Sequence, residues 1–485
     1  MTLGRPIERD SLSTPMRAVW VLTLLVLLFA CDAAAPTPDS EDGDYVLNGA
    51  IGSDPFVFFF APHTINDPRN PDADGIPRQA IDTDLHYNPV SIAQRALAYS
   101  RRYAATGSGS DAEEFLVLAD WLLENAEDRG GYAVWTYAFD YPAFGAVAPW
   151  VSAMAQGLAL PVMLQAYLLT DDVLYLNLAE RAMRAFAHPV SDGGVTRATS
   201  AGPWFEEYGG TFPSQVLNGK IFALAGLLHY GHFADSEMAF DLWTAGSRTL
   251  RDSLAEYDSG FWSNYALAAV PPSPANPVYH LLHIEQLLWM AAATGDSLYT
   301  TYAHRFAQYC SAAHAIREHD LSSIQDIDAS YSIDPIDHGP PQMANGKWSY
   351  GAYWSADRYP VTVEIDFGSI VSDLQSVILF FVTDVSEMSF SIEIAEDSMS
   401  GFTPLYSGPR DWNPQINTSV TVSGPGATTT FVQRMSIDTD GRPARYLRMT
   451  LHTSPSLVAI REINVIYDKS ATIEAIAASL SLRTP

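Results

Sequence analysis

Cysteine is scarce in this chain, with two residues among 485. Cys31 ends a short apolar run near the N-terminus, so we interpret it as part of an export signal. Cys310 is then the only cysteine left in the mature chain, which excludes an intramolecular disulfide there. We expect Cys310 to pack as a small buried hydrophobic side chain.

Positive charge is also scarce. The chain carries 27 Lys and Arg residues against 56 Asp and Glu residues, for a formal net charge of −29. Nucleic acid is therefore excluded as a partner, because phosphate binding needs a basic surface. The same negative net charge opposes long-range attraction of an acidic polysaccharide, so such a substrate would need a local cationic patch.

The N-terminal apolar run, Ala18 to Ala30, is too short to span a bilayer, which takes roughly 20 helical residues. It follows Arg17 and closes in L-F-A-C at Cys31. The pattern predicts a signal peptide with a lipobox over residues 1–31, lipidation at Cys31 and a tether over residues 32–44. The alternative is a plain signal peptide, and Met16 competes with Met1 as the start. We expect an exported, membrane-anchored bacterial lipoprotein, periplasmic or at the cell surface.

Hydrophobic residues make up 47% of the chain and charged residues 17%, which allows a large buried core. Over residues 45–318 the apolar spacing of three and four predicts helices that repeat as hairpins, typical of an α/α toroid. The turns T-D-D-V-L-Y and T-G-D-S-L-Y occupy the same place in two repeats. The expected helices begin at Asn88 and then cover Ala112–Ala126, Ser152–Leu169, Asp172–Ala187, Ser214–His232, Ser236–Leu254, Val278–Ala293 and Ser297–Ala313.

The pattern changes near Ile324, where apolar and polar residues begin to alternate. This alternation predicts a second domain over residues 324–470, an all-β sandwich of the jelly-roll kind, followed by a tail over residues 471–485. The expected strands are Val361–Phe367, Val377–Val382, Phe390–Ala395, Arg445–Leu451 and Ile463–Tyr467. The fold class is therefore multidomain, with an all-α toroid followed by an all-β sandwich.

Three tyrosines stand in polar and aromatic clusters between the helices. They are Tyr208 in W-F-E-E-Y-G, Tyr265 in F-W-S-N-Y-A-L and Tyr279 in Y-H-L-L-H-I-E-Q. A tyrosine has a reference pKa near 10, and neighbouring cations can lower that value so that the phenolate acts as a base. Two tyrosines on opposite faces of a sugar carbon could remove and return a proton, which is epimerase chemistry. Packing of each ring in the core is the alternative.

Five motifs in order give the helical part a resemblance to a known family. They are H-Y-N-P-V-S-I-A-Q, W-V-S-A-M-A-Q-G, W-F-E-E-Y, V-L-N-G-K-I-F-A-L and Y-H-L-L-H-I-E-Q-L. Between Tyr87 and Tyr309 the chain resembles the C-terminal domain of the D-glucuronyl C5-epimerases, which convert glucuronate to iduronate in heparan-type chains. The resemblance implies catalytic roles for Tyr208, Tyr265 and Tyr279, with no cofactor required.

The motif around Tyr265 departs from the family, which has Y-D-L-R where this chain has Y-A-L-A. Ala266 and Ala268 stand in place of a carboxylate and of a guanidinium that could hold the substrate carboxylate. Arg197 and Lys220 are the cations near the motifs that could replace it. Further candidate substrate-binding residues are Glu207, Asn218, Trp204, Trp262, Asn264 and His280. His280 and His283 lie three residues apart, but no third ligand has recognisable spacing, so we expect no catalytic metal.

The β part resembles the discoidin or coagulation factor type C family, a galactose-binding-like domain. Y-W-S-A-D, V-E-I-D-F-G, R-Y-L-R-M-T-L and R-E-I-N-V-I-Y carry this resemblance. It implies a carbohydrate-binding module, and loops that can hold a structural Ca²⁺ ion.

We therefore expect C5-epimerisation of uronic acid residues in a polysaccharide by tyrosine acid/base catalysis. The expected partners are an acidic polysaccharide and, through Cys31, a membrane; a homodimer is left open. A polysaccharide lyase is the enzyme alternative, because it shares the first proton removal. A non-catalytic, carbohydrate-binding surface lipoprotein is the other alternative, motivated by Ala266 and Ala268.

Overall fold

The computed structural model describes residues 70–81, 83–267, 273–310, 314–316, 319–346, 352–383, 388–397, 400–409 and 433–481. The expected signal peptide, the lipidation site Cys31, the linker and Ala268 lie outside these residues. Their assignments, and the domain boundaries drawn from the sequence, stay predictions.

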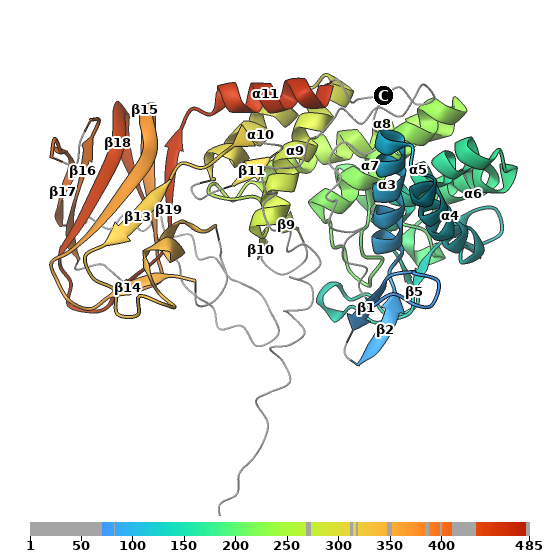
Figure 1. Ribbon diagram of the computed structural model, residues 1–485, viewed down its shortest axis with the longest axis horizontal. Helices are drawn as coiled ribbons and strands as arrows, with labels where there is room; N and C mark the ends of the chain where they lie inside the picture. Colours follow the sequence, from blue (N-terminus) through green and yellow to red (C-terminus); the bar gives the residue numbers. More distant parts are fainter. Residues whose placement is uncertain are drawn as a thin grey trace, which may run out of the picture.

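Between residues 83 and 310, where the structure describes the chain apart from residues 268–272, four helical hairpins follow one another, which confirms the expected helices. In each hairpin the first helix packs against the second, and the first helices of successive hairpins contact one another (Figure 1). Closure of the hairpins into a toroid stays a prediction. The pairs are α3 (Pro89–Thr106) with α4 (Gly109–Glu124), α5 (Ala153–Thr170) with α6 (Val173–Arg184), α7 (Leu217–Ala234) with α8 (Glu237–Ser253), and α9 (Pro277–Thr294) with α10 (Ser297–Gln308).

The turn inside two of the hairpins is built the same way, as the repeated letters predict. α5 ends at Thr170 and α9 at Thr294, and the next residue in each takes a left-handed conformation. The aspartate that follows, Asp172 or Asp296, accepts a hydrogen bond from the backbone of the next helix and caps it. The sequence signal therefore corresponds to one helix end and one helix start.

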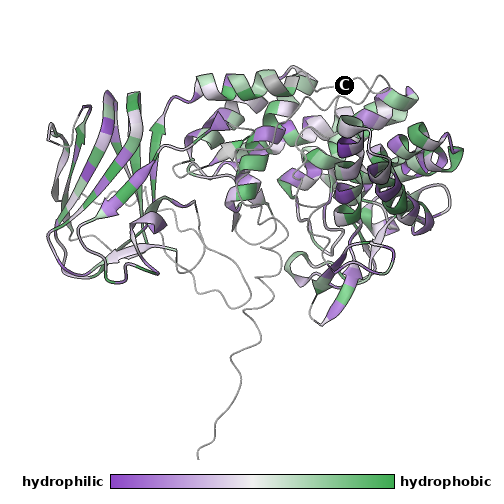
Figure 2. Cartoon of the chain, in the orientation of Figure 1, coloured by the Kyte–Doolittle hydropathy of each residue, from purple (hydrophilic) through white to green (hydrophobic). Residues whose placement is uncertain are grey.

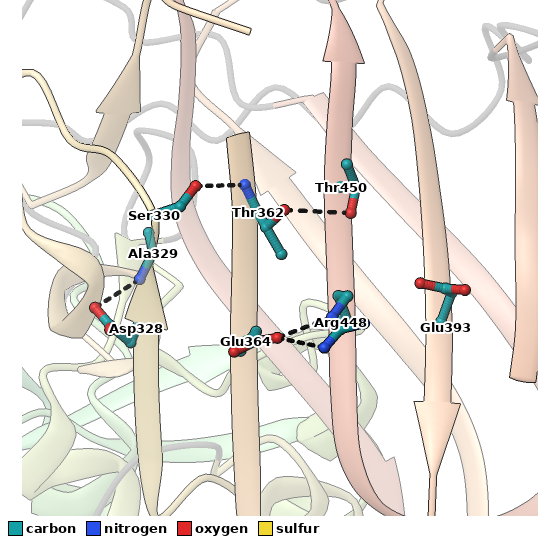
Figure 3. A pocket seen from close by; sticks show the side chains of 8 residues that line it. All are labelled: Asp328, Ala329, Ser330, Thr362, Glu364, Glu393, Arg448 and Thr450. Carbon is teal, nitrogen blue, oxygen red and sulfur yellow. Dashed lines mark hydrogen bonds and ion pairs between the residues drawn. The ribbon is translucent and has the colours of Figure 1, made fainter. Parts of the chain in front are cut away.

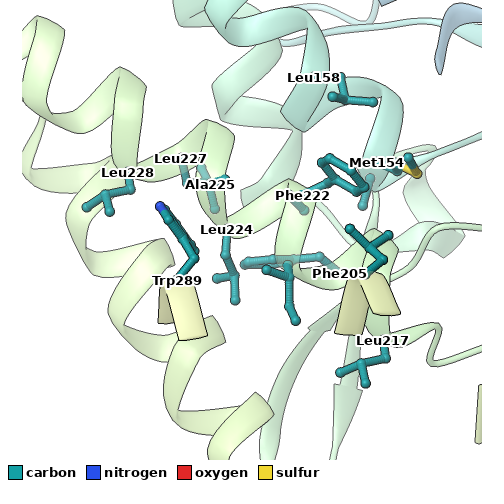
Figure 4. Packing of buried hydrophobic residues seen from close by; sticks show 14 of the residues in the cluster. Met154, Leu158, Phe205, Leu217, Phe222, Leu224, Ala225, Leu227, Leu228 and Trp289 are labelled. Atoms are coloured by element: carbon teal, nitrogen blue, oxygen red, sulfur yellow. The ribbon is translucent and has the colours of Figure 1, made fainter. Parts of the chain in front are cut away.

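The first helices of the hairpins form the core of this domain. α5 and α7 pack so closely that a Cβ atom on Gly226 would lie 2.1 Å from the Gly157 carbonyl oxygen. Met154, Phe222, Leu224 and Trp289 then fill the space between α5, α7 and α9 (Figure 4). α5 is long and apolar enough to cross a membrane by length and composition, but 78% of its apolar window is buried inside the protein.

Short pairs of antiparallel β-strands precede or connect the helical pairs, and they were not expected from the sequence. Figure 1 shows β1, β2, β5, β9 and β10 at the same end of the helices. The pairs are β1 (Arg78–Ile81) with β2 (Asp84–Tyr87), β3 (Glu127–Asp128) with β4 (Ala133–Val134), β5 (Thr136–Tyr137) with β6 (Trp150–Val151), β7 (Thr196–Thr199) with β8 (Gly202–Phe205), and β9 (Asn264–Ala266) with β10 (Ser273–Pro274). Because strands of two to four residues carry almost no periodicity, their sequence signal is weak.

The C-terminal part is an antiparallel β-sandwich, as expected. Its strands run in the order β14–β19–β15–β18–β16–β17, and β13 pairs with β15. The first half of β15 pairs with β13 and the end of β18, and its second half pairs with β19 and the start of β18. The strands are β13 (Asp326–Ala329), β14 (Trp354–Ala356), β15 (Val361–Phe381), β16 (Ser389–Ala395), β17 (Thr403–Pro409), β18 (Gln433–Thr453) and β19 (Val458–Tyr467). The jelly-roll topology stays a prediction.

The sandwich packs directly against the helical part. Along β15, Val377 and Leu379 belong to the sandwich core, whereas Ile378 and Phe380 belong to the core of the helical domain. This period of two places one face of the sheet in each core, and Figure 2 shows the mixed hydropathy along these strands. Within the stretch expected to be a tail, α11 (Ser470–Ser481) is a helix that packs on α9.

Candidate active site

The three tyrosines come together at the strand-bearing end of the helices. Tyr208 follows β8, Tyr265 lies in β9, and Tyr279 lies in the first turn of α9. The hydroxyl oxygens of Tyr208 and Tyr265 are 3.3 Å apart, and the rings of Tyr265 and Tyr279 are 4.9 Å apart. All three residues are partly exposed, unlike the fully buried residues around them.

Glu207 lies beside these hydroxyl groups. The Tyr265 hydroxyl donates to its Oε1 at 3.4 Å, a long hydrogen bond. A Cβ atom on Gly219 of α7 would lie 2.2 Å from Glu207 Oε2, so glycine leaves the space that this carboxylate fills. Burial raises the pKa of Glu207 to about 7, while the hydroxyl groups of Tyr208 and Tyr265 act in the opposite direction. A carboxylate with a pKa near neutrality suits general base catalysis.

The expected lowering of tyrosine pKa values by neighbouring cations is wrong for Tyr208. Burial raises the pKa of Tyr208 well above its usual range, and the Glu207 carboxylate raises it further. Tyr208 therefore stays a phenol at neutral pH and can give a proton rather than take one. The charged group of this cluster is the carboxylate of Glu207.

Aromatic rings wall the cluster on the side of Tyr208. Phe144 lies parallel to the Tyr208 ring with centroids 4.3 Å apart, and Tyr141 is tilted against it at 4.9 Å. Trp150 completes the contact at 5.7 Å. Phe144 belongs to a short 3-10 turn, Pro142–Phe144, that no sequence periodicity indicates, so Phe144 was not among the expected site residues.

Arg197 does not face an open site, which corrects its expected role at the substrate carboxylate. Its Nε lies 3.2 Å from Glu206 Oε1, and its Nη2 donates to the Gly210 carbonyl oxygen at 2.7 Å. Glu206 is fully buried, and its other oxygen accepts from Ser214 and from the Gln215 backbone. Arg197 and Glu206 therefore brace the loop that carries Tyr208.

Lys220 is likewise directed into the interior. It is fully buried, donates to the Pro203 carbonyl oxygen at 3.0 Å, and lies over the Phe205 ring at 3.7 Å from the centroid. Burial lowers the pKa of Lys220 well below its usual range. Lys220 therefore anchors β8 against α7. This corrects its expected role at the substrate carboxylate.

The two tryptophans proposed as sugar platforms are core residues. Trp204 and Trp262 are both fully buried, so neither indole has a face open to a sugar. Trp204 stacks on Tyr257, and Trp262 stacks on His280 with centroids 3.6 Å apart. Their motif positions are next to the site, but their side chains point away from solvent.

His280 holds a strand in place and does not reach a substrate. Its Nδ1 accepts from the Ser263 backbone at 3.2 Å, so its Nε2 carries the proton and donates to the Phe306 carbonyl oxygen at 2.8 Å. The Ser263 hydroxyl then donates to His280 Nδ1 and accepts from His283 Nδ1, each at 2.8 Å. This clamp fixes Ser263, two residues before Tyr265.

The two asparagines differ in how their side chains are used. Asn264 donates to the Glu256 carbonyl oxygen at 3.1 Å and so supports its own loop. Asn218, in the first turn of α7 next to Gly219, is 1% exposed, and its Oδ1 has no hydrogen-bond partner within the described ranges. Glu207 Oε2 is also buried without a partner there. Buried polar atoms normally have a hydrogen-bond partner, so these two acceptors are candidates for contact with a ligand.

No group of three or more His, Cys, Asp or Glu residues is placed to hold a metal ion in the part of the chain that the structure describes. Cys310 is buried, as expected, and burial raises the pKa of its thiol to about 12.

Comparison with known proteins places this site in a family context. Residues 129–308, which contain all three tyrosines, match the family described as D-glucuronyl C5-epimerase C-terminus. The helical part resembles the C5-epimerases. A D-glucuronyl C5-epimerase of Caenorhabditis elegans is 33% identical over 219 residues, which cover 40% of this chain and 34% of that protein.

A second relative is an uncharacterized protein of Methanocaldococcus jannaschii. It is 30% identical over 205 residues, which cover 40% of this chain and 66% of the relative. The chain thus spans about a third of the length of the worm epimerase. These matches support an epimerase-like helical domain.

Solved structures similar to part of the chain include carbohydrate-binding modules. One is CBM32 of AlyQ in complex with 4,5-unsaturated mannuronic acid. It is 20% identical, the match covers 30% of this chain and 95% of that chain, and the TM-score is 0.21. Another is a chitosan-binding module from a Paenibacillus chitosanase/glucanase, with 16% identity, 29% and 92% coverage, and a TM-score of 0.22. At these scores the likeness carries no argument about function.

Proposed function

We propose that the helical domain epimerises C5 of uronic acid residues in a polysaccharide, in the manner of glucuronate to iduronate conversion. The observation that carries this proposal is the row of hydroxyl and carboxyl groups formed by Tyr208, Tyr265 and Glu207, with Tyr279 beside it. It lies within the stretch that matches the epimerase family. Inversion at C5 needs an acid and a base on opposite faces of the sugar.

Glu207 is the base in this proposal. Its carboxylate takes the proton from C5 while the C–H electron pair moves toward the uronate carboxyl group, which becomes an enediolate. Above pH 7 Glu207 is charged and able to accept that proton, because its pKa is about 7. Below that pH it holds a proton and the step stops.

Tyr208 is the acid, since its raised pKa keeps it protonated. It gives its proton to C5 from the other face, and the electron pair of the enediolate forms the new C–H bond. The turnover leaves Glu207 protonated and Tyr208 deprotonated. Tyr265 contacts both groups, at 3.4 Å and 3.3 Å, so it can pass a proton from Glu207 back to Tyr208.

Tyr279 and Asn218 have supporting roles in this proposal. Tyr279 packs on Tyr265 and adds a hydroxyl donor for the developing charge on the carboxyl group. The unpartnered Asn218 oxygen is an acceptor for a sugar hydroxyl. With Arg197 and Lys220 bound elsewhere, tyrosine hydroxyl groups are the donors at hand for the substrate carboxylate.

The test is proton exchange in deuterated water. The full chain is incubated with uronans that contain glucuronate, mannuronate or galacturonate, and C5 deuteration is followed by NMR. We expect deuterium at C5 of at least one uronan. Tyr208→Phe should reduce the rate at which the product with inverted C5 forms, which the same NMR spectra resolve, at least about 100-fold, because general acid–base groups typically contribute 10²–10⁴-fold.

Tyr167→Phe is the matched control, because Tyr167 lies near the far end of α5 and packs against Phe233. It should exchange at the wild-type rate. Ultraviolet absorbance of an unsaturated uronide in the same samples would instead identify a lyase. Absence of deuterium from every uronan would refute the epimerase proposal.

A further inference from the structure

One face of the sandwich is a broad polar surface that the epimerase site does not use. The strands β13, β15, β18 and β16 lie side by side there, and side chains two residues apart on each strand share this face (Figure 3). The opposite layer packs on the helical domain through Ile378 and Phe380. The polar face is therefore directed away from that contact.

Hydroxyl groups form one row across this face. Thr362 on β15 stands opposite Thr450 on β18, and Thr450 stands opposite Ser391 on β16. Ser330 extends the row beyond β15, since its hydroxyl accepts from the Thr362 backbone at 2.9 Å. The row spans three strand spacings of about 4.8 Å each. Each hydroxyl group can donate one hydrogen bond and accept another.

A charged row lies two residues along each strand. It consists of Asp328, Glu364, Arg448 and Glu393, each opposite the next on neighbouring strands. The charged row and three members of the hydroxyl row, Ser330, Thr362 and Thr450, line an open cavity of about 550 Å³ (Figure 3). Its lining holds three carboxylates and one guanidinium group, so the cavity has a surplus of negative charge.

Arg448 is held in one orientation within this cavity. Its Nη2 lies 2.7 Å from Glu364 Oε1, and its guanidinium carbon lies 3.9 Å from the centroid of the Phe402 ring. The contacts with Glu364 and Phe402 hold the flat guanidinium group beside the hydroxyl row. Binding a ligand there therefore costs little further side-chain entropy. Glu393 stands on the other side of Arg448, and Figure 3 draws no interaction between them.

We propose that this cavity binds an uncharged glycan chain, laid across β13, β15, β18 and β16. Neighbouring hydroxyl groups of a sugar can donate to a carboxylate oxygen and accept from a guanidinium or threonine hydroxyl group. The two rows offer these partners side by side. A uronate chain would bring further negative charge to a cavity that already has a surplus of carboxylates. The sandwich would then hold the protein on a neutral glycan, while the helical domain acts on an acidic one.

This inference does not rest on epimerase activity, and its test is independent of it. The full chain is run through native gels that contain xyloglucan, galactomannan, mixed-linkage β-glucan or dextran, and through gels that contain alginate or polygalacturonate. We expect retardation by at least one neutral polymer and none by the two acidic polymers. Oligosaccharides of the retarding polymer then give a Kd by calorimetry.

The variant Thr450→Val with Glu393→Gln removes one group from each row and keeps the shape of both side chains. We expect its Kd to rise at least about tenfold, with the thermal unfolding temperature unchanged. Glu396→Gln is the control, because Glu396 is an exposed carboxylate just past the end of β16 and outside the cavity. Its Kd should stay within about twofold of wild type. Failure of every neutral polymer to retard the chain, or an unchanged Kd in the double variant, would overturn the proposal.

Discussion

At the scale of single residues, Glu207 decides how the site responds to pH. Its pKa in the folded protein is about 7 because of burial, against an ordinary value of 4.5. The folded state therefore binds more protons than the unfolded state between about pH 4.5 and pH 7. The stability that this proton gives is fully present below pH 4.5 and is lost as the pH rises through 7. At higher pH the same residue is charged and ready to act as a base.

We predict opposite trends for stability and exchange between pH 5 and pH 8. The free energy of unfolding should fall by about 3 kcal/mol more in wild type than in Glu207→Gln, since a pKa unit corresponds to about 1.4 kcal/mol. C5 exchange by wild type should rise over the same range. Denaturant unfolding at both pH values measures the first trend, and NMR the second. An equal pH response in the two proteins would show that Glu207 is not the buried titrating group.

The sequence predicted which residues gather at the site better than it predicted their directions. Tyr208, Tyr265 and Tyr279 converge because their motifs lie at the same end of neighbouring helical pairs. Arg197 and Lys220 stand in neighbouring motifs, yet both point to buried carbonyl oxygens or to Glu206. Motif spacing places a backbone position, but the partner of a side chain depends on packing between segments far apart in the sequence.

At the scale of elements, the clamp around Ser263 joins β9 to the start of α9. Ser263 links His280 and His283, while Tyr265 and Tyr279 extend from the same two elements. We predict that Ser263→Ala destabilises the fold by about 1–3 kcal/mol, because it leaves the buried His283 N–H group without an acceptor. The exchange rate at saturating uronan should fall with little change in KM, since Tyr265 loses its support.

Denaturant unfolding and saturation kinetics of the exchange measure both effects. Ser297→Ala offers a control, as Ser297 is an exposed serine at the start of α10. Its free energy of unfolding should stay within about 0.5 kcal/mol of wild type. If Ser263→Ala matched this control, the assigned hydrogen-bond network would be wrong.

Elements with strong periodicity were predicted well, and elements made by tertiary contact were not. The helix expected from Ser214 begins at Leu217, because Ser214 and Gln215 bond to the buried Glu206 carboxylate instead. The short hairpins contain too few residues for a pattern. α11 was not predicted as a helix. Its apolar residues, such as Ile473 and Ile476, are buried by packing on the helical core, a tertiary contact that the local sequence does not indicate.

At the scale of the whole molecule, Lys469 ties the two domains together. It follows β19 of the sandwich and is buried, and its ammonium group donates to three carbonyl oxygens at 2.6–3.0 Å, those of Ala307, Cys310 and Leu321. Burial lowers the pKa of Lys469 to about 8, so its charge is costly in this place. Three hydrogen bonds from one charged group offset that cost. Asn464 adds a bond to the Phe261 carbonyl oxygen, four residues before Tyr265.

We therefore predict that the wild-type chain unfolds on heating in a single transition, and that Lys469→Met divides it into two. Methionine keeps the apolar stem but removes one hydrogen bond from each carbonyl oxygen. The Ala307 and Cys310 oxygens keep other donors, whereas the Leu321 oxygen is left without one among the described residues, which should cost about 1–3 kcal/mol. Scanning calorimetry measures the number of transitions and their temperatures. Glu474→Gln changes an exposed residue of α11, and its calorimetric profile should match that of wild type. A single transition at the wild-type temperature in Lys469→Met would mean that the apolar contact of Phe261 with Phe380 couples the domains by itself.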